Sequence, residues 1–288
     1  TTEEADELIG TLNTRLADGR FKIYTGVSYR HLLKIKDADK RISCTPPHDV
    51  PGAPAMDVMV KSDVPEAEET ADYINSLILD SQEILRDHPV NLRRIAEGKD
   101  PANSIWPWSP GYKPSMETMM TLFGIKKGVV ISAVDLIRGI GVYAGLKPVI
   151  VPGATGLADT NYEGKVQAAI DALKGDADFV FLHIEASDEA GHEGDAALKK
   201  TTVEYLDRRV LRPLLDAVSE MDEDVAMAVL PDHPTPCHLR THTSHPVPFL
   251  IYRSDVAPDE VKHYTEAEAA AGGYGLMQGD EFIREFLK

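Results

Sequence analysis

Residues 128–151 read GVVISAVDLIRGIGVYAGLKPVIV. Two short apolar runs, at 128–132 and 148–151, are separated by a stretch over 133–144 whose apolar residues have helical spacing. Apolar strands that alternate with amphipathic helices are typical of an α/β sheet that is covered by helices on both faces. We therefore predict an α/β fold for this part of the chain.

The same alternation continues toward the C-terminus. Thr160-Asn-Tyr-Glu163 predicts a capping box at the start of a helix that ends at Gly175. A longer helical pattern over 203–218 contains Pro213, which predicts a kink. Further strands are expected at 179–184, 225–230 and 247–252.

The first third of the chain has a different texture. It predicts a helix over 2–17, a strand or hairpin over 21–35 that Gly26 interrupts, and a helix from Glu66 to Arg86 that Pro89 ends. Residues 44–57 carry four prolines, and we expect no regular element there. The change of texture predicts two domains, 1–124 and 125–288.

Composition limits the possible partners. The 288 residues, 43% of them hydrophobic, can bury one large core or two modest ones. The 30 basic and 47 acidic residues give a net charge of −17, which argues against a nucleic-acid or anionic-membrane partner. No apolar run approaches the roughly 20 residues of a membrane span. The two cysteines, Cys44 and Cys237, do not support a disulfide framework, so a cytoplasmic location is expected.

Residues that bind metals gather after the predicted strands. Asp188 and His192 are four residues apart, Asp232-His233 follows the next strand, and His242 comes nine residues later. Six of the ten histidines lie between positions 183 and 245. Mixed carboxylate and imidazole ligands suit divalent Zn or Mn. Five such residues from three segments predict a paired-metal site for phosphoryl chemistry.

Each of these residues also has an ordinary structural explanation. Asp188 can be a helix N-cap, and Asp232-His233 a polar turn after a strand. For His183 and His238, taken singly, a surface or satisfied core position is the preferred interpretation.

Several motifs are more specific. They are Gly26-Val-Ser-Tyr-Arg-His31, Cys44-Thr-Pro-Pro-His-Asp49, Pro152-Gly-Ala-Thr-Gly156, Asp159-Thr-Asn-Tyr-Glu-Gly-Lys165, Asp188-Glu-Ala-Gly-His192, Pro231-Asp-His-Pro-Thr-Pro236 and His242-Thr-Ser-His-Pro-Val-Pro248. Together they resemble the alkaline-phosphatase superfamily and, within it, the cofactor-independent phosphoglycerate mutases of the archaeal type. The resemblance runs the length of the chain.

This resemblance implies a fold and an activity. The fold is an alkaline-phosphatase-like sheet core covered by helices, whose later half is 125–288, with a smaller inserted α+β domain, 1–124, that binds substrate as a lid. The activity is the interconversion of 3-phosphoglycerate and 2-phosphoglycerate through a phosphoserine, with two divalent metal ions as cofactors. Mn is the preferred metal, and Zn, Mg or Co are alternatives.

The resemblance also implies roles for residues. Asp188, His192 and His242 (rather than His245) would hold one ion, and Asp232 and His233 would help hold the other. Basic side chains would bind the carboxylate and phosphate, and the candidates are Arg30, Arg93, Arg94 and Arg138. Each of these can equally be a surface charge. His48 is a candidate general acid/base for the glycerate, or alternatively a residue that orders its loop.

The chain departs from the family in one respect. The family has an Asp after the first core strand and a nucleophilic Ser upstream of the inserted domain, and Ser28 and Ser43 stand in other contexts. We therefore expect these 288 residues to be a fragment that is a poor catalyst alone. The alternatives are a metal-dependent phosphatase or phosphonate-processing enzyme of the same superfamily, and a non-catalytic metal-binding fragment. The oligomeric state is left open.

Overall fold

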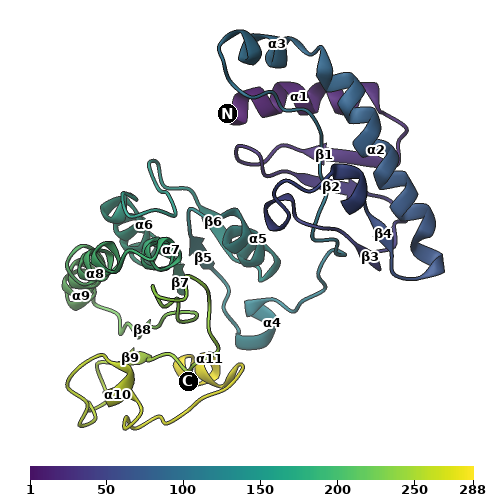
Figure 1. Cartoon of the computed structure of the whole chain (residues 1–288). Helices are drawn as coiled ribbons and strands as arrows, with labels where there is room; N and C mark the ends of the chain where they lie inside the picture. The colour runs from purple at the N-terminus through teal and green to yellow at the C-terminus, as the bar shows by residue number, and fades with distance from the viewer. The chain divides into compact units, whose positions relative to one another are not determined.

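The computed structural model describes residues 1–47 and 49–288 in full and, for His48, the backbone alone. The chain forms two compact units, Thr1–Lys113 and Pro114–Lys288 (Figure 1). Residues 114–124, which the sequence suggests as the end of the first domain, are part of the second unit. The reason is local: the Met119 amide donates to the Ala144 carbonyl at 2.8 Å, and the Met119 side chain packs beside Leu146.

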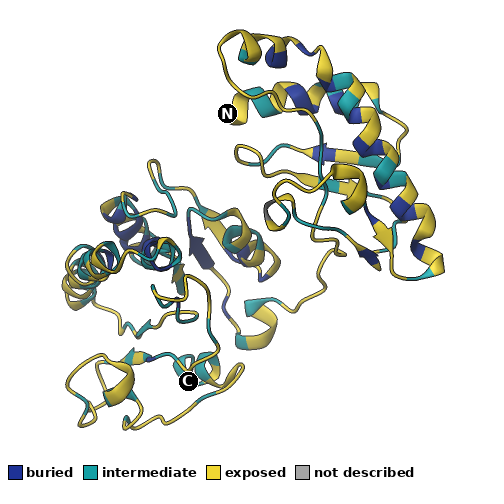
Figure 2. Ribbon diagram, viewed as in Figure 1, coloured by how far each residue is buried: buried dark blue, intermediate teal, exposed yellow. Residues whose placement is uncertain are grey.

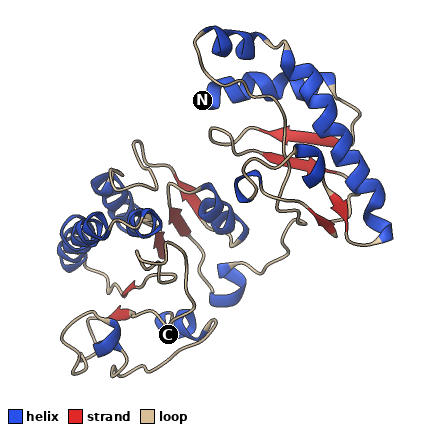
Figure 3. Ribbon diagram, in the orientation of Figure 1, coloured by secondary structure: helices blue, strands red, loops and turns tan.

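The first unit combines helices with two small antiparallel sheets (Figure 3). Strand β1 pairs with β2 as the predicted hairpin, with Phe21 opposite Ile35, and β3 pairs with β4. The Pro-rich stretch contains two short 3-10 helices, η1 and η2, so the prediction of no regular element there is wrong. The elements are α1 (Thr2–Arg15), β1 (Phe21–Tyr24), β2 (Leu32–Ile35), β3 (Ile42–Ser43), η1 (Pro47–Asp49), η2 (Ala55–Val58), β4 (Lys61–Ser62), η3 (Pro65–Ala67), α2 (Glu68–Arg86) and α3 (Pro89–Ala96).

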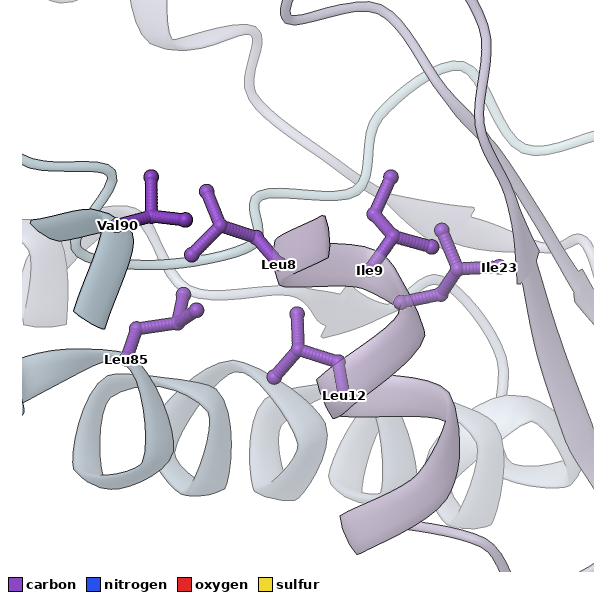
Figure 4. Packing of buried hydrophobic residues seen from close by; sticks show 6 residues of the cluster. All are labelled: Leu8, Ile9, Leu12, Ile23, Leu85 and Val90. Carbon is purple, nitrogen blue, oxygen red and sulfur yellow. The ribbon is translucent and has the colours of Figure 1, made fainter. Parts of the chain in front are cut away.

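Apolar faces of the helices and strands make the core of this unit. Figure 4 shows one cluster, in which α1 packs against β1, the end of α2 and the start of α3 through Leu8, Ile9, Leu12, Ile23, Leu85 and Val90. Burial of each such side chain contributes about 1.5–3 kcal/mol. Helix α2 ends at Arg86, three residues before Pro89, in agreement with the prediction. Pro89 also opens α3, where its missing N–H is not needed, and the His88 side chain caps the Val90 amide.

The second unit contains a three-stranded parallel sheet, in the order β6-β5-β7, and a separate antiparallel pair, β8-β9. The predicted α/β class is confirmed. The elements are α4 (Met119–Phe123), β5 (Gly128–Ile131), α5 (Asp135–Tyr143), β6 (Lys147–Val149), α6 (Tyr162–Lys174), β7 (Phe179–Leu182), α7 (Ala186–Glu193), α8 (Ala196–Tyr205), the π-helix η4 (Leu206–Leu211), α9 (Arg212–Ser219), β8 (Met227–Val229), β9 (Leu250–Tyr252), α10 (Glu266–Ala269) and α11 (Glu281–Phe286).

The central strand β5 is buried along its whole length (Figure 2). Val130 on one face packs with Ala144 and Leu146 after α5, while Ile131 on the other face packs with Ala169 of α6. Burial on both faces explains why this strand is continuously apolar rather than alternating. Its carboxyl end, beside that of β7, is the edge where polar ligands collect in α/β sheets.

Two local predictions need correction or refinement. Asn161, not Thr160, caps α6: its side-chain oxygen accepts from the Gly164 amide at 2.9 Å, while the Thr160 hydroxyl accepts from the Thr155 amide. The helix expected over 203–218 is divided among α8, the π-helix η4 and α9, and Pro213 lies in the first turn of α9. The kink at Pro213 stays a prediction.

Among the described residues, none of the helices is both long and apolar enough to cross a membrane. Cys44 and Cys237 are both free thiols.

Candidate metal centre

Helix α7 positions the first two candidate ligands. After β7 ends at Leu182, a short turn leads into α7, which buries Ala186, Ala190 and Gly191 and carries the partly buried Asp188 and His192. Their i, i+4 spacing places the His192 Nε2 atom 3.3 Å from the Asp188 Oδ2 atom. The two groups therefore share one helix face, as their spacing predicts.

The loop between β8 and β9 brings three more candidate ligands to this face. The Nε2 atom of His242 lies 2.9 Å from that of His192 and 3.7 Å from the Asp188 Oδ1 atom. The His233 ring stacks on the His242 ring, with centroids 3.6 Å apart. Ligand atoms of Asp188, His233 and His242 all lie within 4.8 Å of one another. We call Asp188, His192, Asp232, His233 and His242 the Asp/His cluster.

Asp232 and His233 form a second pair inside this cluster. The His233 Nε2 atom lies 3.2 Å from the Asp232 Oδ2 atom, and the exposed Asp232 also accepts from the His233 amide. Two atoms that each bind one ion at about 2.1 Å in a tetrahedral arrangement lie roughly 3.4 Å apart. The measured separations within the Asp/His cluster are therefore those of groups that can share a cation.

A backbone carbonyl sets the tautomer of His192. Its Nδ1 atom lies 3.1 Å from the Arg240 carbonyl oxygen. A carbonyl only accepts, so Nδ1 carries the proton, and in the neutral ring Nε2 then has the lone pair that a metal ion can take. This is the arrangement that metal-binding histidines show.

Two polar residues, the partly buried His183 and the buried Lys165, were taken as ordinary or missed by sequence reasoning. His183, at the end of β7, is hydrogen-bonded to Ser132 at 3.1 Å; burial lowers its pKa, and the charges of Asp232 and Asp188 work in the opposite direction. Lys165 is only 1% exposed, and burial lowers its pKa against the opposing effect of Glu185. A signal for Lys165 existed, because it interrupts the apolar stripe of α6.

The candidate substrate residues have mixed surroundings. Arg138 of α5 is paired with Asp135. Arg94 is tied to Glu4 at 2.8 Å and to the Asp100 carbonyl, which is the setting of a structural residue.

Arg30 and Arg93 are exposed residues of the first unit, and the guanidinium of Arg30 lies 5.4 Å from the Tyr29 ring centre. The side chain of His48, the candidate acid/base, falls outside the described residues.

Comparison with known proteins places this geometry in context. A family model described as the Metalloenzyme superfamily matches residues 30–280. A protein of Methanosarcina acetivorans named 2,3-bisphosphoglycerate-independent phosphoglycerate mutase is 46% identical over 290 aligned residues, which cover 100% of this chain and 71% of that protein. A protein of Geobacter sulfurreducens with the same name, qualified as probable, is 41% identical and is covered to 70%.

Two solved structures are also similar to this chain. A Pyrococcus horikoshii protein matches with a TM-score of 0.79 at 29% identity, over 99% of this chain and 68% of that one. A structure titled as the cofactor-independent phosphoglycerate mutase of Thermoplasma acidophilum matches with a TM-score of 0.62 at 25% identity, over 94% of this chain and 65% of that one.

Proposed function

This chain belongs to the 2,3-bisphosphoglycerate-independent phosphoglycerate mutases of the metalloenzyme superfamily, and from that premise we propose that its Asp/His cluster binds two divalent metal ions at which 3-phosphoglycerate and 2-phosphoglycerate are interconverted. Asp188, His192 and His242 would hold one ion. Asp232 and His233 would contribute to the other. The observation that carries the proposal is the convergence of these five side chains from α7 and the β8–β9 loop.

The donor set fits such ions. It consists of carboxylate oxygens and imidazole nitrogens without a thiolate, which suits Mn best among the common metals and also admits Zn, Co or Mg. When bound, the ions would activate a nucleophile and neutralise charge on phosphoryl oxygens. The carboxylates supply charge, and the neutral imidazoles supply lone pairs directed by their second hydrogen bonds.

The remaining roles are proposals of the same kind. Arg138 would bind the phosphoryl group, exchanging its present partner Asp135, whose carboxylate is largely exposed, for substrate oxygens. Arg30, Arg93 and Arg94 would bind the glycerate carboxylate, with Arg94 the weakest candidate because Glu4 already neutralises it. His48 as acid/base and a serine as phosphoryl carrier stay predictions. Of the serines considered, Ser43 donates its hydroxyl to Asp63 at 2.6 Å, and Ser28 lies in a turn with a φ of 55°.

The proposed partner is therefore a small molecule, phosphoglycerate. A cytoplasmic location is also proposed, since free thiols such as Cys44 and Cys237 suit a reducing compartment.

A chimera tests the function. The Methanosarcina acetivorans relative exceeds the matched stretch in length, so this chain can replace the matched 71% of it. We expect the chimera to feed an enolase-coupled assay from 3-phosphoglycerate in the presence of Mn²⁺. We expect the same chimera with Asp188→Asn to lose that turnover.

The outcomes separate the alternatives. Release of free phosphate without 2-phosphoglycerate would favour the phosphatase. Tight Mn²⁺ binding without either activity would favour a non-catalytic metal-binding protein. The unmodified relative is the positive control.

A further inference from the structure

Thr235 lies between two predicted ligands. It is 3% exposed, in the loop that follows β8. Its hydroxyl oxygen is hydrogen-bonded to the Asp188 Oδ1 atom and lies 3.3 Å from the His233 Nδ1 atom. Asp188 and His233 are assigned above to different ions, so a single buried hydroxyl contacts one ligand of each.

Counting protons fixes the direction of these bonds. A hydroxyl has one proton to donate, and a carboxylate only accepts, so the Thr235 proton points to Asp188. Toward His233 the hydroxyl oxygen must then accept, so a hydrogen bond at this contact requires a proton on Nδ1. The other ring nitrogen, Nε2, lies 3.2 Å from the Asp232 Oδ2 atom, and an ion bound between these two atoms would take the Nε2 lone pair.

The backbone of Thr235 is held in place by two helices. Its carbonyl oxygen accepts from the Lys199 Nζ atom of α8 at 2.6 Å. On α7, Gly191 has no side chain, and a Cβ there would lie 2.4 Å from the same carbonyl oxygen. The close approach of α7 therefore depends on this glycine, and it brings the hydroxyl within reach of Asp188 one turn earlier on the same helix.

We propose that Thr235 is a positioning residue of the metal centre: its hydroxyl orients the Asp188 carboxylate and the His233 ring, while Lys199 fixes its backbone. The inference rests on the proposed metal-binding function. Hydrogen bonds behind metal ligands of this kind raise affinity, and their loss typically weakens binding about 10–100-fold.

The test compares Thr235→Val, which keeps the shape without the hydroxyl, with Thr235→Ser, which keeps the hydroxyl. Mn²⁺ affinity of the 288-residue chain is measured by calorimetry and by the electron-spin-resonance signal of free Mn²⁺. We expect Thr235→Val to bind about 10-fold more weakly or worse and Thr235→Ser to stay close to the unmodified chain.

A second measurement works without metal. In EDTA, thermal melts of the unmodified chain, Thr235→Ser and Thr235→Val report stability alone. A purely structural role for Thr235 would lower the melting temperature of Thr235→Val in EDTA but leave the Mn²⁺ affinity of the folded protein unchanged. A positioning role predicts weaker Mn²⁺ binding in Thr235→Val and recovery of that binding in Thr235→Ser.

The outcomes are distinguishable. If the unmodified chain fails to bind Mn²⁺, both the proposed function and this inference fall. If it binds and Thr235→Val binds equally well, only the inference falls. Should Thr235→Val not fold, Lys199→Met decides, because we expect it to weaken Mn²⁺ binding, and an affinity equal to that of the unmodified chain would overturn the inference.

Discussion

Two glycines in helix α5 should respond in opposite ways to the same substitution. A Cβ on Gly141 would lie 2.5 Å from the Cγ1 and 2.9 Å from the Cβ of Val130 on the buried strand β5. A Cβ on Gly139, half a turn earlier, would meet no atom within 4 Å. Both sites have helical neighbours, so they differ mainly in the space that the sheet leaves.

The magnitudes follow from this difference. Alanine in place of glycine favours a helix interior by about 1 kcal/mol, so Gly139→Ala should stabilise the second unit by roughly 0.5–1 kcal/mol. Gly141→Ala gains the same propensity but overpacks the interface with Val130, which costs about 1–3 kcal/mol. The net expectation for Gly141→Ala is a destabilisation on the order of 1 kcal/mol.

Amide hydrogen exchange of Val130 and Ile131 measures this locally. Both tryptophans, Trp106 and Trp108, lie in the first unit, so their fluorescence is an internal reference and does not report on β5. In a double-mutant cycle, Val130→Ala should make Gly141→Ala less harmful because it removes the Cγ1 and Cγ2 atoms and leaves only the Cβ contact at 2.9 Å. Equal protection in Gly139→Ala and Gly141→Ala, or no coupling with Val130→Ala, would refute the packing argument.

The other predictions concern the site and its surroundings. Mn²⁺ at about 100 times its dissociation constant should raise the free energy of unfolding by about 2.7 kcal/mol. This rise should be absent in His192→Gln and present in the control His238→Gln. Thermal melts with and without EDTA measure it. The Arg209 guanidinium lowers the pKa of Glu163 to about 2, so the stability from this pair should be full above the ordinary pKa near 4.5 and be lost as the pH falls through about 2. A carboxyl-carbon NMR titration checks the midpoint, which should rise in Arg209→Lys because the two-point contact at 2.6 and 2.8 Å is broken. Arg94→Met should destabilise the first unit by about 1 kcal/mol in urea monitored by tryptophan fluorescence, because Glu4 and the Asp100 carbonyl lose a part-buried partner and Glu4 keeps only the N-terminal ammonium group, whereas exposed Arg93→Met should be neutral.

The sequence predicts the elements well where one period dominates. The runs at β5 and β7 and the stripes of α1, α2 and α6 follow from apolar spacing alone. It fails where alternatives are close in energy. The sequence does not show that Pro89 also opens α3, because that role depends on the His88 side chain, which caps the Val90 amide. Thr160 and Asn161 are both good caps, and the contact of Thr160 with the Thr155 amide leaves the role to Asn161.

The residues of the site also divide into those that the sequence predicts and those that it does not. Asp188, His192, Asp232, His233 and His242 can be proposed from sequence because residue type and strand ends carry the signal. Thr235 and Lys165 cannot be found with equal ease, because their importance comes from burial and from partners distant in sequence, such as Asp188 for Thr235. A threonine in a polar loop has the same appearance whether its hydroxyl faces water or a carboxylate.

Arg240 shows why backbone geometry completes what the motifs begin. It adopts a φ of 57°, a left-handed conformation that costs a residue other than glycine about 1–2 kcal/mol. Its amide donates to the Pro236 carbonyl at 2.9 Å, and its own carbonyl accepts from His192 Nδ1. The tautomer of His192 is thus set by the direction of a carbonyl in a turn two residues before His242. The loop tolerates the unfavourable φ because it joins Pro236 and His192 by these bonds, and any residue can supply a backbone carbonyl. Such a contact leaves no trace in residue types, so it emerges only when the chain is folded.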